Sequence, residues 1–409
     1  MIERFGDDRD WFFEKRFGLF VHWGLYAIPA WHEQIQQIKV IPREEYEPYA
    51  KEFNPTNFDP DAWIDLAIET GMGYICLTTK HHDGFCLFDT AETDYNIMNS
   101  PYGKDLIKEL ADACHKRDFP LCFYYSVADW HNINYPNEGR HHELLVQPND
   151  EPDILKYTEY VRAQIRELCT NYGKVSCIWW DMNVPEHIDK SVNDMIRELQ
   201  PAAVINDRGF DPGDFGTPER DYDQATRNAR SFDRLTEACQ SLGSKSWGYK
   251  TDDDYYGIEH IKRSMDSFMS KGANYLLNVG PMADGTIPQV QVDMLKEIGT
   301  WFNGVKESYI GTDPVSEKTH NQDILLTENG NSLYVHLYKM PSESSLSLMP
   351  INTLPAKAVL LNDGRELPCR VDVLPKIFEP YLQVYDLPIE QYAGDVMVLR
   401  LDFPDGIPG

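Results

Sequence analysis

The sequence predicts an α/β protein: a distorted, TIM-like (β/α)8-type barrel followed by a small C-terminal all-β sandwich domain. Three observations predict this architecture. The chain has 409 residues, which exceeds the ~250 residues of a typical barrel and leaves room for an appended domain. Strand-like and helical patterns alternate up to about residue 310, and short alternating runs separated by turns follow. We therefore expect the barrel to occupy residues 1–312 and the sandwich residues 313–409.

The expected barrel strands are runs of β-forming residues that end in polar side chains. In chain order they include Phe17–Gly24, Tyr74–Thr79, Pro120–Ser126, Val175–Trp180, Ala203–Ile205 and Asn274–Val279. Apolar residues at helical spacing predict helices at Asp61–Thr70, Asp105–Lys116, Ile154–Thr170, Ser191–Gln200, Ile258–Lys271 and Val290–Ser308. About eight strand-like runs separated mainly by helical ones are typical of a (β/α)8 barrel.

The pattern of apolar and polar residues changes after the last of these helices. Short alternating runs follow at Asp323–Leu326, Ser332–Leu337, Ala358–Leu361, Val371–Val373, Leu382–Tyr385 and Val396–Leu401. Turn sequences such as Glu328–Asn331 and Asn362–Gly364 separate them. This spacing of strands and turns predicts the all-β sandwich.

Composition narrows the classes of partner. The formal net charge of −28 argues against nucleic acid or an anionic membrane, because phosphate binding requires clustered Lys and Arg. No run approaches the ~18 apolar residues of a membrane span, and the first residues lack a secretory signal pattern, so we expect a cytoplasmic protein. The eight cysteines are scattered and form no Cys-x-x-Cys pair, which favours reduced core residues over disulfides or zinc.

Candidate functional residues gather where the predicted strands end. His22 ends the first strand, His81 and His82 follow the second, and Asp181 ends the run Val175–Trp180. Catalytic groups of a barrel are presented at this end of the strands. One strand-end histidine alone is more often structural, and Asp181 alone could be a helix N-cap, but three histidines converging with Asp181 indicate a site.

The histidines are compatible with two kinds of site. A metal-dependent barrel hydrolase is one alternative. However, His22 is not part of a His-x-His pair, and the sequence from His32 does not complete a His-Glu-x-x-His zinc motif, because residue 36 is Gln. Tryptophans are near these histidines in sequence, among them Trp179 and Trp247, which favours a sugar site. Imidazoles there hydrogen-bond hydroxyl groups, and an aromatic face covers the apolar side of the ring.

Glycoside cleavage requires two carboxyl groups, one ionised and one held protonated, ~5–5.5 Å apart if configuration is retained. Asp181 is the candidate for the ionised group. Two residues remain open for the acid/base, Glu219 and Glu237. Each could equally be an exposed loop or cap glutamate.

Several blocks of the chain resemble the signature blocks of the glycoside hydrolase family 29 α-L-fucosidases. They are Phe17–Tyr26, Lys80–Phe85, Trp180-Asp181, Asn206–Arg208 and Ser246–Tyr249, in the family's order. The resemblance implies a retaining exo-α-L-fucosidase that hydrolyses terminal α-L-fucosyl residues of oligosaccharides or glycoconjugates, with no metal or organic cofactor. It also implies the barrel and sandwich fold.

The resemblance assigns roles by position. Asp181 matches the nucleophile that forms a covalent fucosyl-enzyme. Residues that match or fall near positions binding fucose or lining its pocket are His22, Glu33, His81, His82, Tyr124, Arg208 and Trp247. Many members have Glu-Trp where this chain has Glu33-Gln34, so the aromatic partner is expected at Trp31. The segment around Glu237 resembles the family's Trp-Glu-x-Cys block, so Glu237 is the expected acid/base and Glu219 the alternative.

Fucose has a methyl group in place of the hydroxymethyl of galactose, so its pocket needs an apolar wall. The candidates are Phe20, Phe85, Trp179 and Trp247. One different wall residue would admit an α-L-galactoside. A non-catalytic carbohydrate-binding protein that keeps the pocket is a further alternative, and a homo-oligomer is possible.

Overall fold

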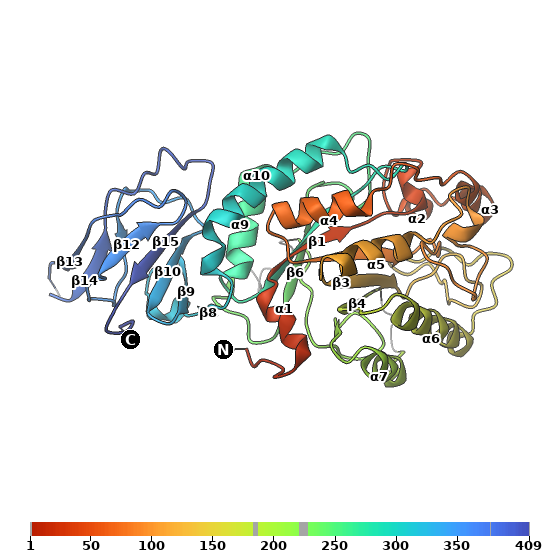
Figure 1. Ribbon diagram of the computed structural model, residues 1–409, viewed down its shortest axis with the longest axis horizontal. Coiled ribbons are helices and arrows are strands. Elements are labelled where there is room, and N and C mark those ends of the chain that lie inside the picture. Colours follow the sequence, from red (N-terminus) through yellow and green to blue (C-terminus); the bar gives the residue numbers. More distant parts are fainter. Residues whose placement is uncertain (1, 183–186, 221–227, 377, 409) are drawn as a thin grey trace.

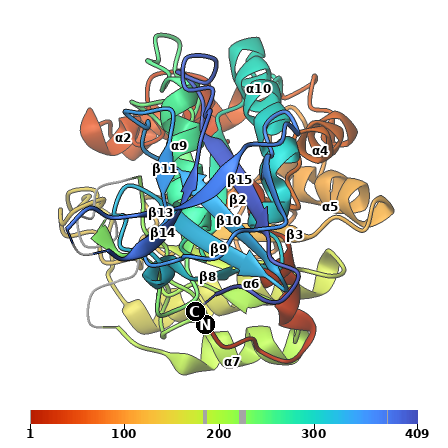
Figure 2. The same ribbon diagram turned by 90° about the vertical axis from the view of Figure 1, so that its left-hand side faces the viewer.

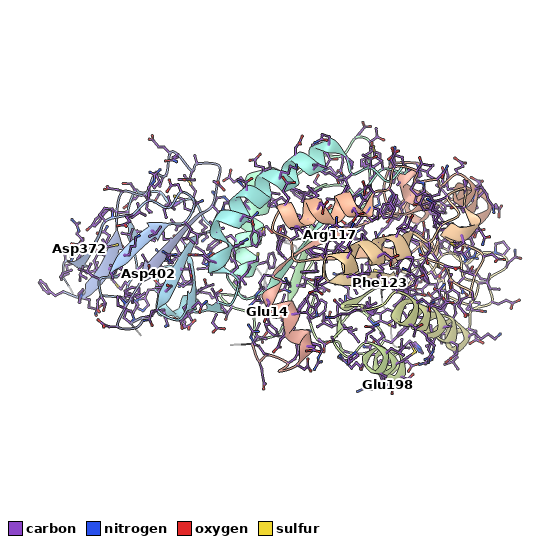
Figure 3. All side chains as sticks on the ribbon, viewed as in Figure 1. Glu14, Arg117, Phe123, Glu198, Asp372 and Asp402 are labelled. Carbon is purple, nitrogen blue, oxygen red and sulfur yellow. The ribbon has the colours of Figure 1, made fainter. Side chains whose placement is uncertain are left out.

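A computed structural model describes residues 2–182, 187–220, 228–376 and 378–408. The molecule is elongated, with a curled parallel sheet and its helices in one part and antiparallel sheets in the other (Figure 1). Side chains fill the interior of both parts, as at the fully buried Phe123, whereas Glu198 lies on the outer helix layer (Figure 3).

The parallel sheet has seven strands in the order β5-β4-β3-β2-β1-β7-β6. They are β1 (Phe17–Val21), β2 (Tyr74–Lys80), β3 (Leu121–Ser126), β4 (Cys177–Asp181), β5 (Val204–Ile205), β6 (Glu237–Ser241) and β7 (Asn274–Val279). Every residue of these strands is buried, as expected of a parallel sheet that is covered on both faces. The six strands named from the sequence are confirmed, and β6 is a seventh strand that the sequence did not predict.

The two edge strands, β5 and β6, approach a common segment. Isolated parallel bridges pair Asn206 with Phe215, Gly216 with Thr236 and Glu219 with Cys239. Backbone bonds run from Asp207 N to Phe215 O at 3.0 Å and from Cys239 N to Pro218 O at 3.0 Å. Residues 215–219 therefore lie between the two edges of the curled sheet.

Helices flank this sheet. They are α1 (Trp11–Glu14), α2 (Ile35–Ile38), α3 (Arg43–Tyr46), α4 (Pro60–Glu69), α5 (Leu106–Lys116), α6 (Ile154–Asn171), α7 (Lys190–Leu199), α9 (Ile258–Met269) and α10 (Gln289–Val305). Four begin after an aspartate whose carboxylate accepts a backbone N–H of the first turn, namely Asp59, Asp105, Asp153 and Asp189. Such caps stabilise a helix start by ~1 kcal/mol each, which explains where α4 to α7 begin.

The C-terminal part consists of two antiparallel sheets (Figure 2). Their strands are β8 (Asp313–Pro314), β9 (Leu325–Asn329), β10 (Ser332–Leu337), β11 (Leu346–Ser347), β12 (Lys357–Leu360), β13 (Cys369–Val373), β14 (Pro380–Val384) and β15 (Met397–Asp402). The sheet orders are β12-β15-β10-β9-β8 and β11-β14-β13. Both sheets contribute to one buried apolar cluster, for example Val335 from the first and Leu382 from the second.

Helices α9 and α10 lie between the parallel sheet and the antiparallel sheets (Figure 1). A buried network joins the two parts there. Asp266 of α9 accepts hydrogen bonds from the Tyr309 hydroxyl at 2.6 Å and from Nδ1 of His336, on β10, at 2.8 Å. Nε2 of the same imidazole lies 2.9 Å from the Thr327 hydroxyl. The Asp266 carboxylate therefore links the part with the parallel sheet to the part with the antiparallel sheets.

Replacing Asp266 with Ala is expected to lower the free energy of unfolding by about 1–3 kcal/mol for each donor that loses its partner. The cause is that Tyr309 and His336 stay buried after the change. Urea unfolding followed by tryptophan fluorescence measures this difference. The control is Asp323→Ala, which removes an exposed ion pair to Lys339 and should cost ~0–1 kcal/mol. Equal losses in the two variants would contradict the assignment.

No helix among the described residues combines the length and apolar character that a membrane crossing requires.

Candidate active site

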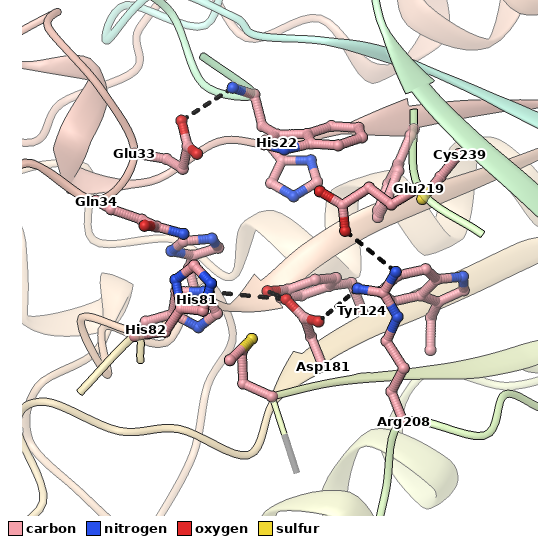
Figure 4. A pocket seen from close by; sticks show the side chains of 15 residues that line it. His22, Glu33, Gln34, His81, His82, Tyr124, Asp181, Arg208, Glu219 and Cys239 are labelled. Atoms are coloured by element: carbon pink, nitrogen blue, oxygen red, sulfur yellow. Dashed lines mark hydrogen bonds and ion pairs between the residues drawn. The ribbon is translucent and has the colours of Figure 1, made fainter. Parts of the chain in front are cut away.

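A pocket with an open volume of about 410 Å³ lies at the carboxyl ends of the parallel strands (Figure 4). Successive strands supply its polar side chains: His22 follows β1, His81 and His82 follow β2, Tyr124 lies on β3, Asp181 ends β4 and Arg208 follows β5. The carboxyl ends of parallel strands meet at one edge, which is why residues far apart in the sequence converge here.

Asp181 lies on the floor of this pocket and is 12% exposed. Its Oδ2 accepts a hydrogen bond from the Tyr124 hydroxyl at 2.6 Å, and its Oδ1 accepts one from Nη1 of Arg208 at 2.9 Å. Burial raises the pKa of Asp181, but the charge of Arg208 and these hydrogen bonds outweigh that effect, so the pKa lies below its ordinary value. The carboxylate is therefore ionised and directed at the cavity.

Arg208 connects Asp181 to a second carboxylate. Its Nη2 donates to Oε2 of Glu219 at 3.1 Å, and Figure 4 shows both carboxylates directed at the same guanidinium. Arg208 is itself held by Thr217, whose hydroxyl accepts from Nε at 2.7 Å, and by the face of Trp179, 4.8 Å away. Two carboxyl groups on one guanidinium are compatible with the ~5–5.5 Å separation of retaining glycosidases.

Two of the pocket histidines are oriented by polar neighbours. Nδ1 of His22 donates to Oδ1 of Asn278 at 2.7 Å, and Nδ1 of His82 donates to the Ser126 hydroxyl at 2.7 Å, because that hydroxyl itself donates to the Ala128 carbonyl. In the neutral rings this leaves each Nε2 as an acceptor. Hydroxyl groups of a ligand can donate to these two atoms.

Burial keeps these imidazoles neutral. It lowers the pKa of His22 to about 4 and that of His82 to about 4, and it lowers the pKa of His81 well below its ordinary value. His81 stacks on Tyr124, with ring centroids 5.7 Å apart, and its buried Nδ1 has no hydrogen-bond partner among the described side chains. The pocket thus offers a polar surface with little positive charge apart from Arg208.

Glu33 and Trp247 form the wall next to His22. Oε2 of Glu33 accepts from the Ser246 hydroxyl at 2.7 Å and from the Trp247 backbone N–H at 2.9 Å. Burial would raise the pKa of Glu33, but His32 and these hydrogen bonds bring it below its ordinary value. The Trp247 ring lies 5.2 Å from the His22 ring and has the Arg220 guanidinium 4.7 Å away.

Glu237 does not line the pocket. It is 1% exposed and lies behind Trp179, whose Nε1 donates to Oε2 of Glu237 at 2.8 Å. Glu237 and Cys239 share one face of β6, and Cys239 is the one that reaches the pocket. Alternate strand residues are ~6.6 Å apart, so Glu237 lies one layer deeper in the sheet interior. The preference for Glu237 over Glu219 is therefore not supported by this geometry.

Burial raises the pKa of Glu237 to about 7, although hydrogen bonds from Tyr74 and Trp179 oppose the shift. A glutamate in an unfolded chain loses its proton near pH 4.5. Between these values the folded state binds more protons, so the free energy of unfolding falls as pH rises from about 4.5 to 7, by up to ~3 kcal/mol at ~1.4 kcal/mol per pKa unit.

Glu237→Gln should lose less stability over this interval, because the amide has no proton to release. Its oxygen can accept from the Trp179 indole N–H, and its NH2 group can donate to the Tyr74 hydroxyl oxygen. Urea unfolding at pH 5 and pH 7.5 checks this expectation. The control Glu219→Gln should keep the pH dependence of the unchanged protein. If the free energy of unfolding of Glu237→Gln fell between pH 5 and pH 7.5 as much as that of the unchanged protein, Glu237 would not be the cause of the pH dependence.

Four further residues line the pocket that the sequence did not single out: Gln34, His142, Met182 and Cys239. The ring centroids of His142 and His82 lie 6.0 Å apart. The long loop of His142 carries no periodic pattern, so no signal in the sequence could have placed it. Trp31 does not line the pocket, and Gln34 occupies that side instead.

Three of the four aromatic residues proposed for the apolar wall line the pocket, namely Phe20, Trp179 and Trp247. The Phe20 ring packs 5.2 Å from Trp179 and 6.2 Å from Trp247. Phe85 instead belongs to the main core, where it contacts Phe53 and Tyr95. Phe20 and Trp247 also contact His22, with ring centroids 4.5 Å and 5.2 Å away, so the aromatic side of the pocket adjoins this histidine.

Within the described ranges, no three or more His, Cys, Asp or Glu residues are grouped so that they could hold a metal ion. Three carboxylates line the pocket, those of Glu33, Asp181 and Glu219.

Comparisons with known proteins point to one family. The family model described as "Alpha-L-fucosidase" matches residues 6–307. Tissue alpha-L-fucosidase of Bos taurus is 27% identical over 412 residues, which cover 93% of this chain and 86% of the relative. The solved structure of alpha-L-fucosidase isoenzyme 1 from Paenibacillus thiaminolyticus is 35% identical, with a TM-score of 0.87, and the match covers 98% of this chain and 100% of that one.

A further solved structure is an alpha-L-fucosidase from Bacteroides thetaiotaomicron, described as a covalent intermediate trapped with 2-fluoro-fucosyl fluoride in a mutant. It is 26% identical, with a TM-score of 0.82, and the match covers 98% of this chain and 97% of that one.

Proposed function

The chain belongs to the α-L-fucosidase family and is a glycoside hydrolase, and on this premise we propose that it is a retaining exo-α-L-fucosidase. Its substrates are terminal α-L-fucosyl residues of oligosaccharides or glycoconjugates. The relative from Bacteroides thetaiotaomicron, trapped as a covalent intermediate, supports a two-step mechanism.

One observation carries this proposal: Asp181 and Glu219 bind the two terminal nitrogens of the same guanidinium in one pocket. Asp181 is buried and ionised, whereas the Glu219 side chain is 36% exposed. The floor carboxylate suits a nucleophile, and the exposed one suits a residue that exchanges protons with a leaving group and with water.

In the first step, Asp181 attacks the anomeric carbon while protonated Glu219 gives its proton to the departing oxygen, which leaves a β-fucosyl ester on Asp181. Glu219, when protonated, can still accept the Arg208 bond through its carbonyl oxygen. In the second step, ionised Glu219 takes a proton from water, the water oxygen attacks the anomeric carbon, and Asp181 leaves. Two inversions return the α configuration.

The remaining pocket residues bind the sugar in this scheme. The Nε2 atoms of His22 and His82 accept hydrogen bonds from fucose hydroxyls, and His81, Glu33 and Tyr124 complete the polar side. Phe20, Trp179 and Trp247 supply the aromatic side, which takes the methyl group.

We also infer that the curled sheet is a closed (β/α)8-type barrel in which residues 215–219 take the eighth position. The bridges from this segment to both edges support closure. The division into a barrel over residues 1–312 and a sandwich over residues 313–409 is part of the same proposal, supported by the separate apolar cluster of the C-terminal sheets.

The test is hydrolysis of an aryl α-L-fucoside followed by proton NMR from the first minute. We expect α-L-fucose to form before mutarotation produces the β anomer. The matching aryl α-L-galactoside, which adds one hydroxyl where the aromatic wall stands, is expected to react more slowly. First appearance of the β anomer would overturn retention, and binding of fucose without any turnover would overturn the catalytic role.

A further inference from the structure

Two long connections form a layer above the strand ends, one over residues 30–51 and one over residues 129–151. They are tied together by three contacts: Arg43 binds the Trp130 carbonyl and the Asp150 carboxylate, and Nδ1 of His131 lies 2.6 Å from Oε1 of Glu47. The side chains of Arg43 and Asp150 are 12% and 0% exposed. This layer is therefore a fixed part of the molecule.

Each connection contributes one residue to the rim of the pocket, Gln34 from the first and His142 from the second. Both are half-buried, whereas His22, His82 and Asp181 beneath them are buried. A terminal sugar held by the buried residues directs its leaving group toward the rim. Gln34 and His142 belong to that rim.

The same two connections enclose a second hollow, a groove with an open volume of about 870 Å³. Its apolar lining consists of Val40, Ile41, Pro42, Leu144, Leu145 and Val146. Three of these are unusually exposed for aliphatic residues, Val40 at 63%, Leu145 at 61% and Val146 at 63%. Exposed apolar surface gathered in one hollow marks a binding surface.

The pocket and the groove share a wall. His142 lines the pocket, and the next residue, Glu143, lines the groove. The Cα atoms of two consecutive residues are ~3.8 Å apart, so a single stretch of backbone separates the pocket from the groove at this point. His142 has φ = +64°, the left-handed conformation, which turns the chain between the two hollows. The Trp130 indole N–H holds this turn by donating to the His142 carbonyl at 2.9 Å.

The first connection is strained at the matching point. Val40 has φ = +52°, which is rare for a β-branched residue, and neighbouring bonds such as Ile41 N to Gln36 O at 2.8 Å hold it there. Residues kept in such conformations cluster at ligand sites, where the surrounding structure compensates for their cost. This backbone conformation directs the Val40 side chain into the groove, where most of its surface is exposed.

We propose that this groove binds the leaving group of the substrate and that the enzyme favours α-L-fucosides whose leaving group carries an extended apolar portion. Gln34 and His142 contact the first atoms beyond the glycosidic oxygen, and the groove takes the apolar part. This inference rests on the proposed fucosidase function and adds a class of leaving group to it.

Ethyl and hexyl α-L-fucosides test the proposal, because their alcohols have nearly equal acidity and differ only in chain length. We expect kcat/KM for the hexyl fucoside to exceed that for the ethyl fucoside by ~10-fold or more, since four additional CH₂ groups leave water. In the double variant Leu145→Ser/Val146→Ser, this ratio should fall toward one. The matched control is Val371→Ser/Val373→Ser on β13, with side chains that are also exposed, which should keep the ratio.

The outcomes are distinguishable. No turnover of any α-L-fucoside would remove the proposed function itself. Turnover with equal kcat/KM for both chain lengths would overturn the groove assignment alone. Sedimentation of both double variants tests whether the groove is instead a contact between copies of this chain. If only Leu145→Ser/Val146→Ser dissociates an oligomer, the groove is such a contact, and the leaving-group assignment is overturned.

Discussion

Asp181→Ala is expected to lower kcat for an aryl α-L-fucoside by roughly four orders of magnitude, because the covalent step loses its nucleophile. Azide fits the space left by the carboxylate and can attack from the same face. It should therefore restore part of the activity and give β-fucosyl azide, since this single displacement inverts the configuration.

A smaller control change at the same place is Tyr124→Phe, which removes one hydrogen bond to Asp181 but keeps the carboxylate. It should reduce activity far less and should not respond to azide. Activity of Asp181→Ala within tenfold of the unchanged protein, measured without azide, would be incompatible with Asp181 as the nucleophile.

Glu219→Ala is expected to lower kcat/KM for alkyl α-L-fucosides by about 10²–10⁴, because the poor leaving group then departs without a proton. For an activated aryl fucoside the first step needs little proton donation, and the slow step becomes hydrolysis of the ester. Azide should accelerate that step and give α-fucosyl azide, because two displacements retain the configuration.

Glu237→Gln is the matched control for this prediction. It changes a buried glutamate that does not reach the pocket, so it should affect the pH dependence of stability without creating a response to azide. Should the α-azide form with Glu237→Gln and not with Glu219→Ala, the assignment of the proton donor would be reversed.

The position of Asp181 in the pocket could be predicted from the sequence because its signal is local. The run Val175–Trp180 is apolar and Asp181 ends it, and the carboxyl ends of parallel strands define one surface. The same reasoning places His22, His81 and His82 correctly beside Asp181. Each of these positions depends only on where a strand ends.

The choice between Glu219 and Glu237 depended on depth, which a sequence does not reveal. Glu237 begins β6 and points inward, two residues before Cys239 on the same face. Glu219 lies in a segment without a regular pattern and reaches the pocket because its backbone pairs with Cys239. Which glutamate lies nearer the surface is decided by the register between these two segments.

His142 and Gln34 show a second limit. Both lie on long connections whose course is fixed by tertiary contacts, such as those of Arg43 with Trp130 and Asp150. No periodicity in these stretches indicates the direction of a side chain. The residues at the rim of the pocket therefore could not be predicted from the sequence, whereas Asp181 at its floor could.

In the proposed mechanism Asp181 becomes covalently fucosylated while Glu219 moves the proton. The most direct measurement uses Glu219→Gln incubated with 2-fluoro-fucosyl fluoride, whose good leaving group needs no acid, followed by mass spectrometry of the intact protein and of its peptides. We predict one fluorofucosyl group per chain, attached to the peptide that contains Asp181 and absent from Glu219→Gln/Asp181→Ala. An adduct on any other residue, or the same adduct in the double variant, would contradict the account.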